Sequence, residues 1–194
     1  MSAKRRVILD HDVGVDDHSR LKRRVILDHD GGVDDLLSLA MLLAMEDVEL
    51  VGVVVTPADC YLGPALSATR KLLRWFGRDV PVAAGRLHGV NAFPAEWRAA
   101  PYRVDALPVL NDDDRPLPPV CDEAGDALIA RLLREAREPV TILVTGPPSH
   151  VAAALAAAPA LAPKVAEIVW MGGALRVRGN VAQHEHDGSA EWNA

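Results

Sequence analysis

From residue 23 onward, the chain alternates between two patterns of hydrophobic and polar positions. Short runs rich in Val, Ile and Leu are followed by longer stretches in which apolar residues recur every three or four positions. The short runs are typical of buried strands, and the longer stretches are typical of helices that pack on them. The predicted strands are residues 25–27, 48–55, 80–84, 140–144 and 165–170, and the predicted helices are residues 34–46, 64–76, 124–136 and 150–157.

One long stretch carries neither pattern. Residues 86–119 are rich in proline, include an acidic run at residues 112–114, and predict a long loop. Elsewhere the alternation of strands and helices predicts an α/β fold with a mainly parallel central sheet flanked by helices. Ligands of such sheets bind at the carboxyl ends of the strands, so the residues that follow each strand are the candidates for function.

The first predicted strand occurs twice in the sequence. Residues 5–17 and 23–35 are identical except that Val13 of the first copy corresponds to Gly31 of the second. Only the second copy is followed by the apolar pattern of a buried helix. We therefore expect residues 1–22 to be a duplicated N-terminal extension and residues 23–194 to form one α/β domain.

The composition limits the kinds of molecule that the protein is expected to bind. The net charge is −6, which argues against a nucleic-acid binder, because such proteins neutralise phosphates with Lys and Arg. The N-terminus lacks the uninterrupted apolar region of a signal peptide, and no apolar run approaches the length of a membrane span. The chain has only 2 cysteines, without metal-ligand spacing, which favours a reducing compartment. We expect a cytoplasmic protein that binds a cation or a small polar ligand.

Four aspartates follow the first strand of the second copy within eight residues: Asp28, Asp30, Asp34 and Asp35. Such carboxylates repel one another unless a hard cation neutralises them, and oxygen-only ligands suit Ca²⁺ or Mg²⁺. Helix N-termini favour Asp, which accounts for Asp34 and Asp35 without any ligand. It does not account for Asp28 and Asp30 at the end of an apolar strand. The pattern therefore predicts a metal or ligand site.

These residues also carry a family resemblance. The segment Asp28-His29-Asp30-Gly31-Gly32-Val33-Asp34-Asp35 resembles the DxDxGxDD signature of the inosine-uridine-preferring nucleoside hydrolases. Residues 171–173 (MGG), 179–180 (GN) and 190–193 (AEWN) resemble later motifs of that family in the same order. The resemblance spans residues 23–194. It implies a nucleoside-hydrolase-like (Rossmann-like) fold and hydrolysis of the N-glycosidic bond of ribonucleosides in purine or pyrimidine salvage.

The resemblance also implies a Ca²⁺ cofactor and roles for individual residues. Asp30 and Asp35 would bind Ca²⁺ together with the carbonyl of Thr145. Asp30 would also be the catalytic general base, which takes a proton from a Ca²⁺-bound water as that water attacks the anomeric carbon. Asp28 would lie behind these ligands. The groups expected to bind the ribose are Asp34, Asp59, Met171, Asn180, Glu191 and Asn193, with Asp59 standing where many members have Asn.

The sequence departs from the family pattern at three places. His150 replaces the usual Asn after the Thr-Gly-Pro motif, and we interpret it as a helix-start residue. The acidic and histidine-rich residues 184–187 are interpreted as a solvated loop. Family members continue beyond the position of Ala194, with another calcium carboxylate and, in many members, a histidine near the leaving base. We therefore expect a fold that is incomplete at the C-terminus and weak hydrolysis by this form. Whether the protein forms a homo-oligomer is left open by the sequence.

Two other functions remain open from the sequence. The first is a Mg²⁺-dependent phosphatase that resembles the haloacid dehalogenases, with Asp28 as nucleophile, Asp30 as acid and base, Thr145 as a phosphate contact and Lys164 as the basic residue. The second is a truncated product that binds calcium and ribose without catalysis. Asp34 and Asp35 directed into the site would discriminate against the phosphatase.

Overall fold

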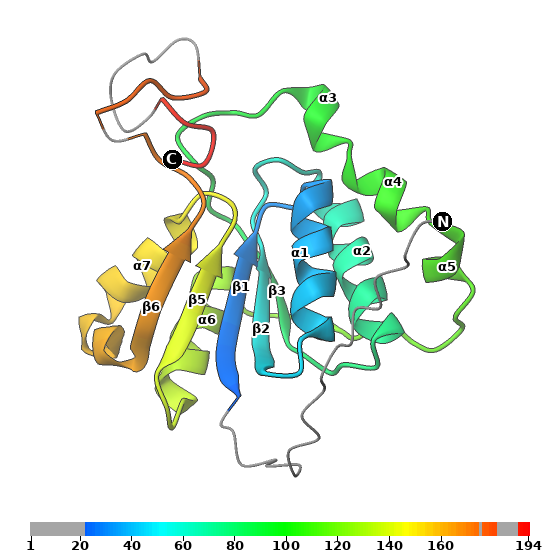
Figure 1. The fold of residues 1–194 in the computed structure, drawn as a ribbon, viewed down its shortest axis with the longest axis horizontal. Coiled ribbons are helices and arrows are strands. Elements are labelled where there is room, and N and C mark those ends of the chain that lie inside the picture. Colours follow the sequence, from blue (N-terminus) through cyan, green and yellow to red (C-terminus); the bar gives the residue numbers. More distant parts are fainter. Residues whose placement is uncertain (1–21, 175, 182–189) are drawn as a thin grey trace, which may run out of the picture.

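The computed structural model of the protein describes residues 22–174, 176–181 and 190–194. Six strands form one sheet in the order β4-β3-β2-β1-β5-β6, and each neighbouring pair runs parallel (Figure 1). The predicted α/β fold with a parallel central sheet is thereby confirmed. The strands are β1 (Arg23–His29), β2 (Val48–Val55), β3 (Val82–Ala84), β4 (Val120–Cys121), β5 (Val140–Val144) and β6 (Val165–Trp170).

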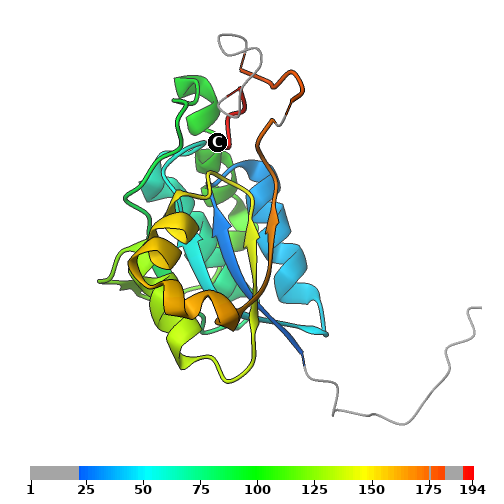
Figure 2. The same ribbon diagram turned by 90° about the vertical axis from the view of Figure 1, so that its left-hand side faces the viewer.

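Helices cover both faces of the sheet (Figure 2). Successive side chains of a strand point to opposite faces, so Leu27 of β1 packs with α1 and α2, whereas Ile26 packs with α6 and α7. Two buried apolar clusters result, one on each face. The helices are α1 (Val33–Ala44), α2 (Leu62–Trp75), α3 (Ala95–Arg98), α4 (Pro101–Asp105), α5 (Pro108–Asn111), α6 (Gly125–Glu135) and α7 (Ser149–Ala157), and a 3₁₀ helix, η1, spans Pro159–Lys164.

The strand order creates a switch point between β1 and β5. The chain places β2, β3 and β4 successively on one side of β1 and then returns to place β5 on the other side. The two strands end side by side, because the N–H of Thr145 donates to the carbonyl of Asp28 at 2.9 Å. Ligands of open parallel sheets bind where the strand order reverses in this way. The residues after β1 and β5 therefore lie at the expected position of a ligand.

The predicted long loop contains three short helices, so that prediction was wrong for residues 95–98, 101–105 and 108–111. Each of these helices begins at a proline or directly after one, where the missing N–H costs no helical hydrogen bond. None is longer than 5 residues, which is too short to show a helical period in the sequence.

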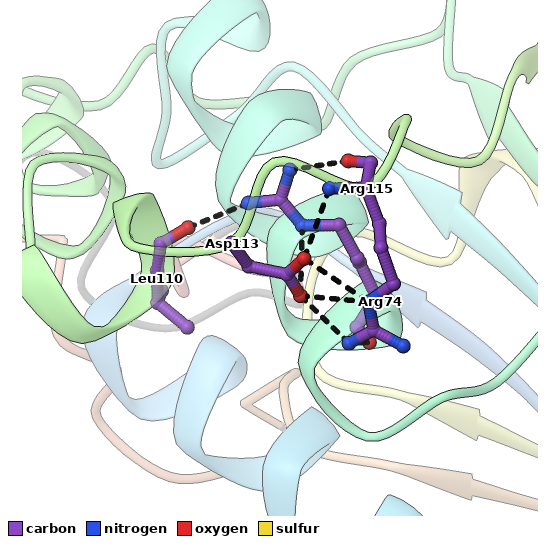
Figure 3. A network of polar contacts seen from close by, with 4 residues as sticks. All are labelled: Arg74, Leu110, Asp113 and Arg115. Carbon is purple, nitrogen blue, oxygen red and sulfur yellow. Dashed lines mark hydrogen bonds and ion pairs between the residues drawn. The ribbon is translucent and has the colours of Figure 1, made fainter.

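The acidic run in this region is held by α2 and lies away from the strand ends. Arg74 of α2 donates to the carbonyls of Leu110 and Arg115, at 2.8 and 2.7 Å, and its Nε lies 3.5 Å from Asp113 (Figure 3). Hydrogen bonds from Arg115 lower the pKa of Asp113 to about 2. These contacts give Asp113 a structural role in fixing the segment after α5 to α2.

Two predicted features lie outside the described residues. They are the first copy of the repeat, residues 5–17, and the segment at residues 184–187. Their interpretation stays a prediction. Among the helices that the structure describes, none has both the length and the apolar character needed to cross a membrane.

Candidate active site

The site begins where β1 passes into α1. Asp28, His29 and Asp30 are all buried, with at most 3% of each residue exposed. Gly31 then adopts a φ of 82°, and a Cβ at this position would lie 2.7 Å from the Cβ of Cys60. Only glycine fits both the left-handed backbone and this close approach. The turn thus places Asp30 at the carboxyl edge of the sheet.

The N-terminus of α1 contributes the next two carboxylates. Asp35 is buried, and its Oδ2 accepts the N–H of Gly32 at 2.8 Å. This contact satisfies one of the free N–H groups at the start of the helix and places a negative charge at its positive end. Asp34 is exposed. A Cβ at Gly32 would lie 2.6 Å from Asp34 Oδ1 and 3.5 Å from Asp59 Oδ2, so both carboxylates approach the Gly32 backbone.

The surroundings of Asp30 and Asp59 disfavour the charged forms of these carboxyl groups. Oδ2 of Asp30 accepts the N–H of Asp59 at 3.4 Å, a long hydrogen bond. Burial, together with the neighbouring Asp35 and Asp59, raises the pKa of Asp30 to about 10. Burial and the charges of Asp35 and Asp34 raise the pKa of Asp59 to about 6. The group therefore takes up protons at neutral pH unless a cation compensates its charge.

The turn after β5 lies against Asp30. A Cβ at Gly146 would lie 2.7 Å from the Cβ of Asp30, so glycine permits this approach. The preceding carbonyl, of Thr145, accepts the side-chain amide of Asn193 at 2.9 Å. The same amide lies 3.3 Å from the carbonyl of Met171, directly after β6. Asn193 thus joins the ends of β5 and β6 to the last described segment of the chain.

Two further predicted ribose-binding residues contact each other. Asn180 donates from Nδ2 to Glu191 Oε1 at 2.6 Å and accepts the N–H of Trp192 at 3.0 Å. The structure therefore places Asp28, Asp30, Asp34, Asp35, Asp59 and Thr145 around the ends of β1 and β5, and it connects Met171 and Asn193 to Thr145. Asn180 and Glu191 connect to this group through the chain segment that carries Asn193.

The donor atoms at the site suit a hard cation. Asp59 Oδ1, Thr145 Oγ1 and Asn193 Oδ1 are buried without a hydrogen-bond partner among the described residues. Oxygen is the ligand that Ca²⁺ and Mg²⁺ prefer. Within residues 22–174, 176–181 and 190–194, however, no three His, Cys, Asp or Glu side chains are placed to hold one metal ion. A cation site here would need backbone oxygen, such as the Thr145 carbonyl, beside Asp30 and Asp35.

The hydrogen bonds that join Asp28, Thr56 and His150 were not predicted from the sequence. Thr56, directly after β2, donates to Asp28 Oδ1 at 2.6 Å, and its Oγ1 lies 3.0 Å from Nδ1 of His150. Burial raises the pKa of Asp28 to about 7. His150 is the second residue of α7, as expected of a helix-start residue, but its side chain is fully buried. The position of Thr56 at a strand end was the available signal.

Known proteins share the sequence pattern and the fold of this chain. The family model described as inosine-uridine preferring nucleoside hydrolase matches residues 25–194. The chain belongs to this family. It is also similar to the crystal structure of an inosine-uridine preferring nucleoside hydrolase from Bacillus anthracis, with 47% identity and a TM-score of 0.82. That similarity covers 88% of this chain and 57% of the Bacillus chain.

Other nucleoside hydrolases in the comparison differ in their named base preference. A pyrimidine-specific ribonucleoside hydrolase, RihA, from Salmonella schwarzengrund is 34% identical over 142 residues, which cover 72% of this chain and 44% of that protein. A purine-preferring ribonucleoside hydrolase from Gardnerella vaginalis is 26% identical with a TM-score of 0.61, over 86% of this chain and 54% of that one. This chain thus spans about half the length of these relatives.

The phosphatase interpretation gains no support from the site. Lys164 lies where β6 begins and donates to the carbonyl of Ala136 at 2.7 Å. Asp28 lies at the carboxyl end of β1, and the two strands run parallel to the intervening β5, so Lys164 is at the opposite end of the sheet. Asp35 is buried at the site, which disfavours a phosphatase because that mechanism leaves it without a role.

Proposed function

We propose that the protein hydrolyses the N-glycosidic bond of ribonucleosides to ribose and free base. The observation that carries this proposal is the buried Asp30 carboxyl, which adjoins Asp35 and Asp59 and lies against the turn after β5. This position is the switch point of the sheet, where a small ligand is expected. Membership of a nucleoside hydrolase family supports the reaction class.

Asp30 acts as the general base in this proposal. Asp30, Asp35 and the carbonyl of Thr145 would hold Ca²⁺, and the bound ion would supply a water of lowered pKa. The positive charge would also lower the pKa of Asp30 from its raised value, so that this carboxylate can accept a proton from the attacking water. Asp28 supports Asp30 from behind, because Thr56 holds its Oδ1 and Thr145 holds its carbonyl.

The remaining polar groups would bind the ribose. Carboxylate oxygens accept hydrogen bonds from sugar hydroxyls, and Asn side chains can also donate to them. Negative charge beside the sugar stabilises the oxocarbenium-like transition state of glycosidic cleavage. We assign this role to Asp34, Asp59, Asn180, Glu191 and Asn193, with Met171 against the sugar.

The test is ribose release from inosine and uridine by the purified chain with added Ca²⁺. Ca²⁺-dependent release by the wild-type protein that is lost in Asp30→Asn supports the proposal. Release that persists in Asp30→Asn contradicts the assignment of the base. Ca²⁺-dependent ribose binding without any release favours the non-catalytic alternative. Because the chain covers 57% of the Bacillus relative, the measurement should be sensitive enough to detect slow turnover.

A further inference from the structure

His150 occupies a slot built for its ring. The residue is fully buried, and the slot is bordered by two glycines from different parts of the fold. A Cβ at Gly85, after β3, would lie 2.6 Å from Cε1 of His150, and a Cβ at Gly125, at the start of α6, would lie 3.1 Å from Cδ2. Side chains at either position would displace the imidazole. The packing therefore selects a flat ring at residue 150.

The hydrogen bonds of the ring fix the position of its proton. Nε2 accepts the N–H groups of Arg86 and Leu87, at 3.0 and 3.1 Å. Both partners are donors, so Nε2 carries no proton and the neutral ring must be protonated on Nδ1. Nδ1–H then donates to Thr56 Oγ1 at 3.0 Å, and the Thr56 hydroxyl donates to Asp28 Oδ1. Burial lowers the pKa of His150, in agreement with a neutral ring.

The backbone that His150 holds belongs to a loop with several other contacts. Gly85 donates to the carbonyl of Val55 at 2.8 Å, which fixes the start of the loop to β2. Further along, Val90 donates to the carbonyl of Ala194 at 2.9 Å. The side chain of Asn91 donates to the carbonyl of Glu191 at 2.8 Å. Residues 85–91 therefore connect the buried ring to residues 191–194, which include two proposed ribose-binding groups.

We propose that His150 is a positioning residue for the sugar site. Its Nε2 holds the backbone of Arg86 and Leu87, and through residues 85–91 it positions the segment that carries Glu191 and Asn193, of which Asn193 contacts Thr145. The proposed effect on substrate binding rests on the proposed function, since that function gives Glu191 and Asn193 their ribose role. The hydrogen-bonding role of the ring does not depend on it.

A purely space-filling role would make a different prediction. Phenylalanine would fill the same slot but would leave the N–H groups of Arg86 and Leu87 without this acceptor and the Thr56 hydroxyl without a donor. Glutamine keeps both an acceptor and a donor in a side chain of similar reach. The comparison of His150→Phe with His150→Gln therefore separates hydrogen bonding from packing.

The first measurement concerns the wild-type chain and needs no activity. Nitrogen-15 NMR of the histidine rings should show His150 neutral at pH 7, with the proton on Nδ1. A proton on Nε2, or a charged ring, would overturn the proposal. Because it uses the unmodified protein, this result stands even where a variant fails to fold.

Amide hydrogen exchange tests the contact with the loop. In His150→Phe we expect exchange of Arg86 and Leu87 to accelerate at least ~10-fold, and His150→Gln should recover most of the protection. Ser149→Ala is the matched control, because Ser149 donates from the same helix end to the carbonyl of His88 at 2.7 Å. It should leave the amides of Arg86 and Leu87 protected. Unchanged exchange in a folded His150→Phe protein contradicts the proposal.

The third measurement separates positioning from general damage to the fold. Misplaced ribose-binding groups should raise KM for inosine by roughly 10-fold in His150→Phe, with a smaller change in kcat, and His150→Gln should lie closer to wild type. A fall of roughly 10-fold in kcat with an unchanged KM would overturn the positioning role. If the wild-type chain releases no ribose, the proposed function fails, whereas the NMR and exchange results still decide whether His150 holds the loop.

Discussion

At the scale of single residues, Asp30 combines deep burial with negative neighbours. Asp30→Asn keeps the size of the side chain and adds no negative charge beside Asp35 and Asp59, so we expect the variant to fold. Loss of the proposed general base should lower ribose release from inosine by about 10²–10⁴-fold. The matched control is Asp114→Asn, the same change at an exposed position of the acidic run. Equal activity of both variants would show that Asp30 is not the base.

The raised pKa values of Asp28 and Asp30 make a second prediction at this scale. An unfolded Asp titrates near pH 3.9, whereas these carboxyls have pKa values of about 7 and about 10 in the folded chain. Between the pKa of the unfolded chain and those of the folded chain, the folded state therefore binds more protons than the unfolded state. The free energy of unfolding consequently falls as pH rises above about 4. Without Ca²⁺, the Tm of the wild-type chain should fall more between pH 5 and pH 8 than that of Asp30→Asn.

Calcium should reverse this trend, because a bound cation replaces the protons on the carboxylates. Added Ca²⁺ is expected to raise Tm more at pH 8 than at pH 5. The increase should be reduced in Asp30→Asn and in Asp35→Asn, and retained in Asp114→Asn. A Tm that does not respond to Ca²⁺ in the wild-type chain at pH 8 would contradict the calcium assignment.

At the scale of elements, the start of α6 is fixed by close contact with the sheet. A Cβ at Gly125 would lie 2.4 Å from Cγ1 of Val54, near the carboxyl end of β2, besides approaching His150. Gly125→Ala should therefore destabilise the fold by about 1–3 kcal/mol, the usual cost of overpacking. Gly63→Ala is the matched control, because a Cβ there, in the first turn of α2, meets nothing within 4 Å. Urea denaturation of both variants measures the difference in their free energies of unfolding. Equal stability of the two variants would contradict the prediction.

The elements also show which parts of the structure the sequence could predict. The strands β2, β5 and β6 have the predicted limits, because continuous β-branched and apolar runs mark buried parallel strands. The aspartates after β1 were also predicted as site residues, because they are charged residues directly after a buried apolar run. The slot of His150 was not, because it depends on Gly85 and Gly125, which only the packing of α6 and α7 on the sheet brings together. The short helices α3 to α5 were missed because they are stabilised by distant contacts, such as that of Arg74 with Leu110.

At the scale of the whole molecule, β6 forms one edge of the described sheet, and this strand is exposed to solvent. It pairs with β5, and no second strand pairs with it among the described residues. Ile168, Val169 and Trp170 are 45%, 46% and 41% exposed, an unusual amount of apolar surface for an edge strand. Natural sheets protect such edges with charges or by covering them, because unpaired strands associate.

We therefore expect the 194-residue polypeptide to self-associate through β6 as its concentration rises. Sedimentation velocity over a range of concentrations would measure this. Val169→Lys should reduce the association, because the charge would have to be desolvated in the contact. Val109→Lys makes the same change at a position of α5 that is 50% exposed, away from β6, and should leave the association unaltered. A wild-type chain that stays monomeric, or equal effects of the two lysines, would show that the exposed edge of β6 does not drive association.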